Sequence, residues 1–264
     1  MNKKLPVFFH IPKNAGTYIN NRCFSIMRQQ SDGRSPYHID VLKSGVICYR
    51  VLCFCTAGLS DSYKKINNVC YQVNIEDFDL NSLQLFMIRV SDSGFKSYQK
   101  DIYALLPDDV QPYEFICLRE PYDRIQSLYS YIQSAQSSRE TTHMAFGKKS
   151  FVEYLNSPQL EGSWLLRNLL NIPNETPVTR EHFDKTCKLL DHMFVFNTGD
   201  VDQSLAKVFM DCYSFDSSNI IDVVYNNKTQ DKINVSFDSL DDMTKVSFLN
   251  QTRWDKKLYN NYVH

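Results

Sequence analysis

The 264-residue chain has no long apolar run and no excess of charge of either sign. No stretch approaches the ~18 consecutive apolar residues of a membrane-spanning helix, and no apolar segment with a cleavage site stands at the amino terminus. The 29 Lys and Arg residues nearly balance the 30 Asp and Glu residues, so no global basic field favours nucleic acid. We therefore expect a soluble, cytoplasmic protein without a transmembrane span, in which any anion site is local.

The eight cysteines show no metal-binding pattern. Cys53 and Cys55 form a C-x-C pair inside an apolar run, and no second pair follows at the spacing of a zinc site. Cys23 and Cys117 fall in segments expected to be buried, where free cysteine behaves as a small hydrophobic residue. The sequence thus predicts no metal centre.

The composition suffices for one hydrophobic core. Hydrophobic residues make up 43% of the chain and aromatic residues 13%, and the length suits a single large α/β domain. No internal repeat or low-complexity segment marks a second unit. We expect one domain over residues 1–264.

The segment PVFFHIPKNAGTYI, residues 6–19, predicts a strand, a tight loop and a helix. Residues 5–11 are apolar and aromatic, as in a buried parallel strand, and Pro12 cannot donate to a sheet ladder. Gly16 lets the backbone approach a ligand closely, and Thr17 is the expected helix cap. The apolar face of the helix then follows a helical spacing to about residue 30, through Ile19, Cys23, Ile26 and Met27.

This loop suits an anion. A helix amino terminus offers unpaired N–H groups and the positive end of a dipole, and Lys13 adds a full charge. The loop differs from the nucleotide-binding pattern G-x-x-x-x-G-K-S/T, because Lys13 precedes Gly16. The alternative is an ordinary turn between strand and helix with a surface lysine.

A second strand, turn and helix follow further along the chain. Residues 113–118 predict a short buried strand, and Pro121 suits the first turn of the next helix. Arg119 follows the carboxyl end of that strand, where open α/β sheets bind ligands. Its guanidinium can hold a phosphate with two donors, and Ser127 can add a hydroxyl. The alternative is an arginine at a sheet edge and a serine on a solvated face.

The rest of the chain predicts a loop over 31–45, strands over 45–56, 83–90 and 193–196, and helices over 97–106, 151–170, 182–192 and in the carboxyl-terminal tail. Residues 58–82 are mixed and polar, with no clear pattern.

The two motifs together resemble those of sulfotransferases that use 3′-phosphoadenylyl sulfate (PAPS), in particular carbohydrate sulfotransferases of the heparan-sulfate 2-O-sulfotransferase kind. The loop is similar to F-F-H-I-P-K-T-A-G-T, with Asn14 in place of Thr, and the second motif is similar to R-D/E-P-x-x-R-x-x-S-x-Y. Residues 193–205 and 240–259 also resemble family segments, whereas residues 31–82 match least and read as a divergent insertion. The resemblance implies an α/β fold with a P-loop-NTPase-like parallel sheet flanked by helices.

The same resemblance implies transfer of the sulfuryl group of PAPS to a hydroxyl of a carbohydrate or similar acceptor, with no metal. Lys13 would stabilise the charge that builds on the leaving phosphate. Arg119 and Ser127 would bind the 3′-phosphate, and Lys228 is a further candidate near the nucleotide. The 5′-phosphosulfate would bind at Asn14, Ala15, Gly16, Thr17 and Tyr18.

The family's usual general base is absent from its usual position. Residues 88–93 resemble an H-V-S stretch of the family, but Arg89 occupies the His position, and arginine does not lose its proton. Asp92, His38 and Glu76 are the substitute bases, because each can accept a proton.

His10 belongs to the loop motif and is expected to be structural. The missing base keeps a second function open, a catalytically impaired module that binds PAPS or its product, adenosine 3′,5′-bisphosphate (PAP). A nucleotide kinase is a third hypothesis, against which the order of Lys13 and Gly16 argues.

Overall fold

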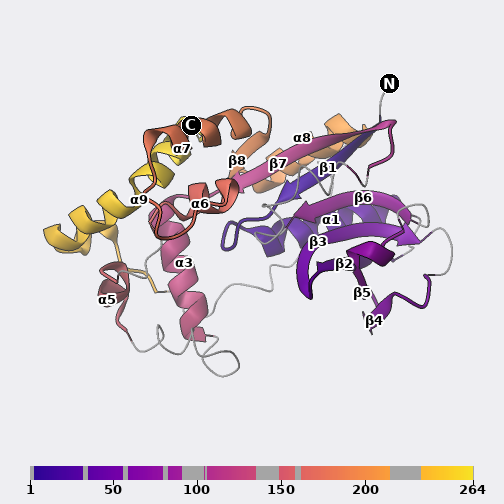
Figure 1. Cartoon of the computed structure of the whole chain (residues 1–264), viewed down its shortest axis with the longest axis horizontal. Helices are drawn as coiled ribbons and strands as arrows, with labels where there is room; N and C mark the ends of the chain where they lie inside the picture. Colours follow the sequence, from indigo (N-terminus) through magenta and orange to yellow (C-terminus); the bar gives the residue numbers. More distant parts are fainter. Residues whose placement is uncertain are drawn as a thin grey trace.

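The structure, a computed structural model, describes residues 3–31, 35–55, 59–79, 83–90, 104, 106–134, 149–157, 162–214 and 233–263. Within these residues the chain forms an α/β fold in which an eight-stranded sheet is flanked by helices (Figure 1). The strands lie in the order β4-β5-β2-β3-β6-β1-β7-β8. Their bounds are β1 Lys3–Phe9, β2 Tyr37–Lys43, β3 Val46–Cys55, β4 Lys64–Asn67, β5 Cys70–Asn74, β6 Leu83–Val90, β7 Val110–Leu118 and β8 Phe194–Asn197.

The longer helices are α1 Gly16–Gln30, α3 Pro121–Ser134, α7 Arg180–Leu190, α8 Val201–Tyr213 and α9 Asp242–Tyr262. Shorter helical turns are η1 Ile75–Asp77, α5 Phe151–Leu155, α6 Trp164–Leu170 and η4 Phe237–Ser239. The helix predicted over 151–170 is therefore two short helices. The helix predicted over 97–106 falls almost wholly outside the described residues.

One half of the sheet is parallel. Strand β1 pairs in parallel with β6 on one side and β7 on the other, and β7 pairs in parallel with β8. Every residue of β1 from Leu5 to Phe9 is buried, as the continuous apolar run predicted. The strands predicted over 83–90, 113–118 and 193–196 are also present, so the carboxyl ends of β6, β1, β7 and β8 share one edge.

The other half corrects the prediction of a parallel sheet, because the sheet is mixed. Strand β3 runs antiparallel to both β6 and β2, and β4 runs antiparallel to β5. The loop predicted over 31–45 was wrong for residues 37–43, which form β2. The reason is a hairpin whose two turn residues, Ser44 and Gly45, have φ of 53° and 77°. Positive φ at both positions is typical of the two-residue turn that joins antiparallel strands.

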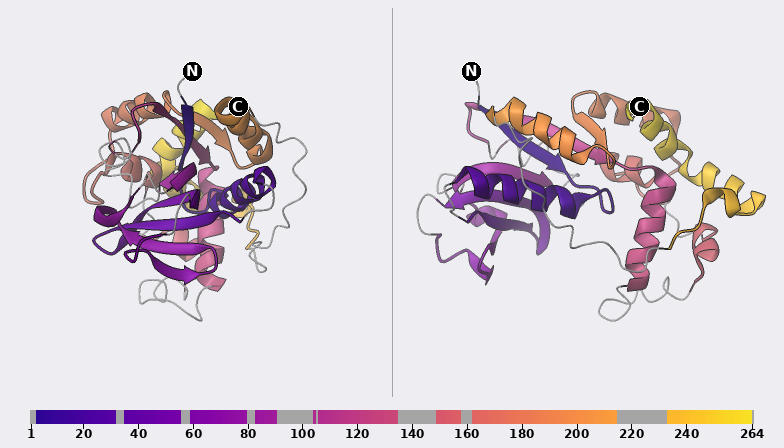
Figure 2. Two further views of the ribbon diagram at one scale, coloured as in Figure 1. Left: turned by 90° about the vertical axis from the view of Figure 1, so that its right-hand side faces the viewer. Right: turned by 180° about the vertical axis from the view of Figure 1, so that it is seen from behind.

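Helices cover both faces of the parallel half (Figure 2). On one face α1 and α8 pack on Phe8, Phe115 and their neighbours, through Ile19, Cys23, Val208 and Phe209. The other face carries Leu5, Val7 and Phe9, which belong to one hydrophobic cluster with Leu166 of α6, Phe183 of α7 and Leu258 of α9. The strand from Leu5 to Phe9 is thus buried on both sides, which explains its lack of alternating polar residues.

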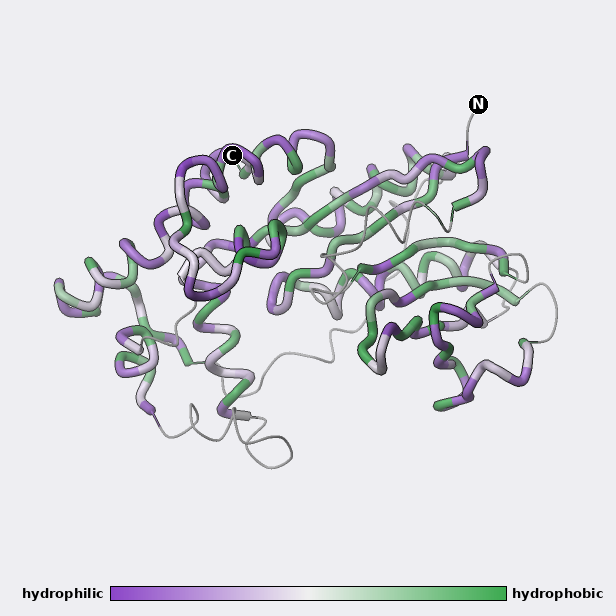
Figure 3. The backbone as a smooth tube through the Cα atoms, viewed as in Figure 1, coloured by the Kyte–Doolittle hydropathy of each residue, from purple (hydrophilic) through white to green (hydrophobic). Residues whose placement is uncertain are grey.

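A third cluster lies beyond the carboxyl edge of the sheet, where α3, α5 and α9 meet. Aromatic side chains dominate it, and it includes Tyr122, Tyr129, Phe151, Tyr154 and Phe248. In Figure 3 these helices alternate between hydrophobic and hydrophilic residues, as expected for helices that bury one stripe. The cluster holds α3 at the edge where the two predicted motifs end.

Candidate functional site

The structure brings the two predicted anion-binding motifs together. The loop of residues 10–15 follows β1, and Arg119 follows β7, which is the parallel neighbour of β1. The Arg119 guanidinium donates a hydrogen bond through Nη1 to the Lys13 carbonyl at 3.2 Å. The Asn14 amide donates through Nδ2 to the Cys117 carbonyl at 2.9 Å. Both bonds join the loop to the end of β7, so we define residues 10–18 and 119–127 as one anion loop pair.

The loop has an unusual backbone. Lys13 and Ala15 both lie in the left-handed region, with φ of 69° and 56°, which costs free energy for residues that carry a Cβ. The Asn14 N–H closes the turn on the Ile11 carbonyl at 3.2 Å. Asn14 is buried, with an exposed fraction of 2%, and its Nδ2 ties the loop to the end of β7.

The first turn of α1 is free of side-chain caps. Helix α1 begins at Gly16 with Ala15 as its N-cap, which corrects the expectation that Thr17 caps it. Ala15 makes no side-chain cap hydrogen bond, and the first turn holds no acidic residue. The first turn itself thus places no negative charge at the positive end of the dipole, and its backbone N–H groups have no partner within the helix.

Two predicted binding residues turn their side chains elsewhere. The Tyr18 hydroxyl donates to the Asp202 carboxylate of α8 at 2.7 Å, and Arg22 forms an ion pair with the same carboxylate at 3.0 Å. The Lys13 ammonium lies 4.4 Å from the centre of the Tyr131 ring on α3. Tyr18 therefore offers the site its backbone, whereas Lys13 keeps its charge at the surface where α3 meets the loop.

The second motif is arranged around the start of α3. Glu120 caps this helix, since its Oε2 accepts from the backbone N–H groups of Tyr122 and Asp123 at 2.7 and 3.1 Å. The α3 terminus is thereby occupied, in contrast to α1. Ser127 is buried on the second turn, and Arg119 is half-buried.

A small pocket of about 10 Å³ lies between the loop pair and α9. Asp255 borders it, and its Oδ2 accepts from the Leu165 N–H at 3.1 Å. Burial raises the pKa of Asp255 to about 6, against the opposing effect of the nearby Arg124. Among the described residues, Asn14 Oδ1 and Asp255 Oδ1 are buried without a hydrogen-bond partner. The lining residues are Ile11, Asn14, Leu118, Arg119, Pro121, Arg124, Leu165, Asp255 and Tyr259.

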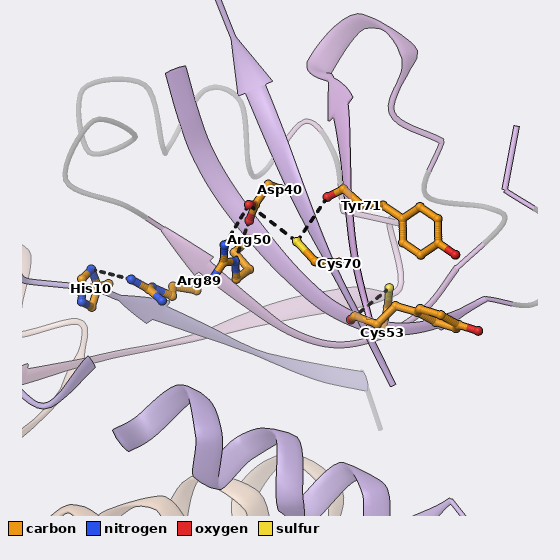
Figure 4. A network of polar contacts seen from close by, with 8 residues as sticks. His10, Asp40, Arg50, Cys53, Cys70, Tyr71 and Arg89 are labelled. Atoms are coloured by element: carbon orange, nitrogen blue, oxygen red, sulfur yellow. Dashed lines mark hydrogen bonds and ion pairs between the residues drawn. The ribbon is translucent and has the colours of Figure 1, made fainter. Parts of the chain in front are cut away.

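A row of polar residues crosses the sheet on the face that α1 covers (Figure 4). Asp40, Arg50 and Arg89 are direct cross-strand neighbours on β2, β3 and β6. Arg50 forms a bidentate ion pair with the buried Asp40, at 2.5 and 2.8 Å. Arg89 reaches the other way and donates through Nη2 to Nδ1 of His10 at 3.0 Å. Sequence reasoning missed this row, and the only signal for it was Arg50 inside an apolar run.

The proposed bases are not brought to the loop within the described residues. His38 lies on β2, stacked on Phe24 of α1 with ring centres 5.2 Å apart. Three strand spacings, about 14 Å, separate β2 from β1. Burial, with help from Arg50, lowers the pKa of His38 to about 4. Glu76 is exposed on η1, one strand further away, and Asp92 and Lys228 lie outside the described residues.

Comparisons of the chain with protein-family models, with curated proteins and with solved structures found no match. Of the helices in the described part of the chain, none has both the length and the apolar character needed to cross a bilayer. In the same residues no three His, Cys, Asp or Glu side chains are grouped to hold a metal ion. The geometry of the loop pair is therefore the main structural feature that bears on function.

Proposed function

We propose that the chain is a PAPS-dependent sulfotransferase that moves the sulfuryl group to a hydroxyl of a carbohydrate or similar acceptor. The observation that carries the proposal is the hydrogen bond from Arg119 to the Lys13 carbonyl. It brings two loops, each resembling a phosphate-binding motif of that family, to one edge of the parallel strands. The proposal assigns β6, β1, β7 and β8 to a P-loop-like sulfotransferase fold, to which β2–β5 are added.

In this proposal each half of the loop pair binds one phosphate. The backbone N–H groups of the first α1 turn and the Lys13 ammonium bind the 5′-phosphosulfate, because both are positive and the first turn of α1 holds no acidic residue. Arg119 and Ser127 bind the 3′-phosphate, which distinguishes PAPS from ATP. Lys13 then stabilises the charge that develops on the leaving phosphate as the sulfuryl group passes in line to the acceptor.

A general base completes the reaction by taking the acceptor proton. His38 is disfavoured because three strand spacings separate it from β1. Asp92 remains our proposed base, since it follows Val90 by two residues in the sequence, and Val90, the last residue of β6, pairs with Phe9 at the carboxyl end of β1.

A second function is favoured by one observation. Arg89, at the position where the family carries its base, is occupied with His10 and cannot accept a proton. This observation supports a module that binds PAP or PAPS without transferring sulfate. Both functions require nucleotide binding, and they differ only in turnover.

Thermal unfolding with PAP tests the binding that both functions share. PAP at a hundred times its Kd adds about 2.7 kcal/mol to the free energy of unfolding, which raises the Tm of a chain of this length by about 5–10 °C. We expect this shift with PAP and a much smaller one with ATP or ADP, which lack the 3′-phosphate. Equal shifts with ATP would favour a kinase, and no shift with any of them would contradict both functions.

Transfer of radiolabelled sulfate from PAPS to a panel of acceptor sugars then separates the two functions. Incorporation above that of an Arg119→Ala variant supports the enzyme. If the protein binds PAP but transfers no labelled sulfate to any acceptor, polysaccharides included, the result supports the binding module.

A further inference from the structure

His10 occupies the junction between β1 and the anion loop. Its backbone N–H donates to the Val90 carbonyl at 2.9 Å, which continues the pairing of β1 with β6 by one residue. Its ring meets the ring of Phe8 edge-on, with centres 6.0 Å apart. The imidazole is thus held at the carboxyl edge of the sheet, next to the start of α1.

Two contacts fix the orientation of the ring. On one side Arg89 Nη2 lies 3.0 Å from Nδ1 (Figure 4). On the other side the ring covers Gly16, where a Cβ would lie 1.9 Å from Cδ2 and 2.0 Å from Nε2 of His10. Only glycine at position 16 leaves room for the imidazole, so Nε2 lies directly against the first residue of α1.

The protonation of the ring follows from these contacts. A guanidinium has donors only, so Nδ1 of His10 must accept and carries no proton. Burial, together with the charges of Arg89 and Arg50, lowers the pKa of His10 to about 3. The ring is therefore neutral at neutral pH, and its one proton is on Nε2.

We propose that Arg89 locks His10 in the Nε2–H tautomer and that this N–H is a neutral hydrogen-bond donor to the anion held at the start of α1. His10 is then a ligand of the 5′-phosphosulfate, and Arg89 is its positioning residue. Because Nε2 is protonated and Nδ1 is occupied by Arg89, His10 does not act as the general base. This inference rests on the proposed function for the identity of the anion, but not for the tautomer.

The arrangement accounts for two further features. Arg89 and Arg50 are like charges directly opposite each other on one face of the sheet, which destabilises a sheet on its own. Arg50 is compensated by Asp40, and Arg89 finds an acceptor in a histidine that must stay neutral. The second feature is the contact of the imidazole with Gly16, which places a donor beside backbone N–H groups that already favour an anion.

Nitrogen NMR of the ¹⁵N-histidine-labelled protein tests the tautomer directly. The chain has six histidines, and the His10 signals are those lost in His10→Gln. We expect a protonated Nε2 and an unprotonated Nδ1 at pH 7 and still at pH 5, and a mixture of tautomers in Arg89→Met. An imidazolium, or a proton on Nδ1, in the wild-type protein at pH 7 would overturn the proposal.

The donor role of His10 is tested by two substitutions, each of which replaces one of the two ring nitrogens with an amide group. The amide of Gln reaches the position of Nε2–H, whereas the shorter Asn reaches only that of Nδ1. We expect His10→Asn to weaken PAP binding in calorimetry by on the order of 10- to 100-fold, and His10→Gln to weaken it by several-fold less. His192→Asn, an exposed histidine after α7, is the matched control and should bind as the wild type does.

PAP binding by the wild type and by the His10 variants distinguishes a wrong donor role for His10 from a wrong proposed function. If the wild type binds PAP and both His10 variants bind it equally well, the donor role is wrong and the sulfotransferase proposal stands. If the wild type binds no PAP, the proposed function fails, and inorganic sulfate becomes the probe. Movement of the His10 Nε2–H resonance with sulfate then supports the donor, and no movement overturns it.

Discussion

The guanidinium of Arg119 donates a hydrogen bond to the backbone carbonyl of Lys13 over 3.2 Å, although 106 residues separate them in the chain. The contact is made by the two residues that the proposal assigns to the opposite ends of one ligand. It lies on the shared carboxyl edge of β1 and β7, and it ties the geometry of the loop after β1 to Arg119, the residue proposed to bind the 3′-phosphate. Ligand binding at either half is therefore expected to depend on both.

Arg119→Ala should abolish the rise in Tm that PAP produces and lower the stability of the free protein by about 1 kcal/mol, the typical worth of one hydrogen bond. Arg180→Ala is the control, because Arg180 is exposed on α7 and contacts Asp184 and the Phe183 ring of its own helix. Thermal unfolding of both variants with and without PAP makes the comparison. A full PAP shift in Arg119→Ala would show that the 3′-phosphate is not read here.

Gly16→Ala should destabilise the protein and disrupt the loop, because the added Cβ would meet the His10 ring at 1.9 Å. Overpacking of this kind costs about 1–3 kcal/mol. The double variant His10→Ala with Gly16→Ala should be more stable than the sum of the two single changes predicts, since removal of the ring makes room for the methyl group. Strict additivity in urea unfolding would contradict the packing of His10 on Gly16.

Asp255→Asn should change how stability depends on pH. The folded-state pKa of Asp255 is about 6, above the 3.8 of a free carboxyl group, so between these values the folded protein binds more protons than the unfolded one. Asp255 thus makes stability fall as pH rises from about 4 to about 6, by on the order of 2–3 kcal/mol. The variant should lack this fall and be the more stable protein at pH 7.

Urea unfolding at pH 4.5, 5.5 and 7 measures this effect as the difference between wild type and variant. His10 and His38 act in the opposite direction, since their pKa values are lowered, but they are common to both proteins and cancel in the difference. Asp242→Asn, on the exposed first turn of the same helix, is the control and should leave the profile unchanged. A constant difference across the pH range would contradict an ionisation of Asp255 in this window.

Asp40→Asn should cost about 3–5 kcal/mol, because it leaves Arg50 without its carboxylate in a partly buried site and leaves Arg50 opposite Arg89. The double variant Asp40→Leu with Arg50→Met should cost less than Asp40→Asn alone, since it removes both charges. Denaturant unfolding gives both values.

Glu181→Gln is the control for this prediction, because it breaks the exposed pair with Lys185 on α7 and should show no measurable change. A similarly small effect of Asp40→Asn would mean that the pair is solvated.

The sequence predicted the elements that are defined by local patterns. The strand before the anion loop, the helix after it, the strand over 83–90 and the strand and helix around Arg119 were all readable from apolar runs and helical spacing. These patterns are local because burial on both faces of a parallel strand demands a continuous apolar run. The resemblance implied only that both loops bind one nucleotide, whereas the pairing of β1 with β7, which places the two loops at one edge, came from the structure.

The tertiary structure alone decided the direction of the strands and the cross-strand contacts, because both depend on pairing between residues far apart in the sequence. The mixed sheet depends on the turn at Ser44 and Gly45 and on the register of β3 against β6, and a strand's apolar pattern does not specify its direction. The row from Asp40 through Arg50 to Arg89 exists only in that register, because a slip of one residue would move each side chain to the opposite face. The sequence by itself thus determined where the anion loops begin, whereas strand pairing decided that Arg89 reaches His10 and that Gly16 lies beneath its ring.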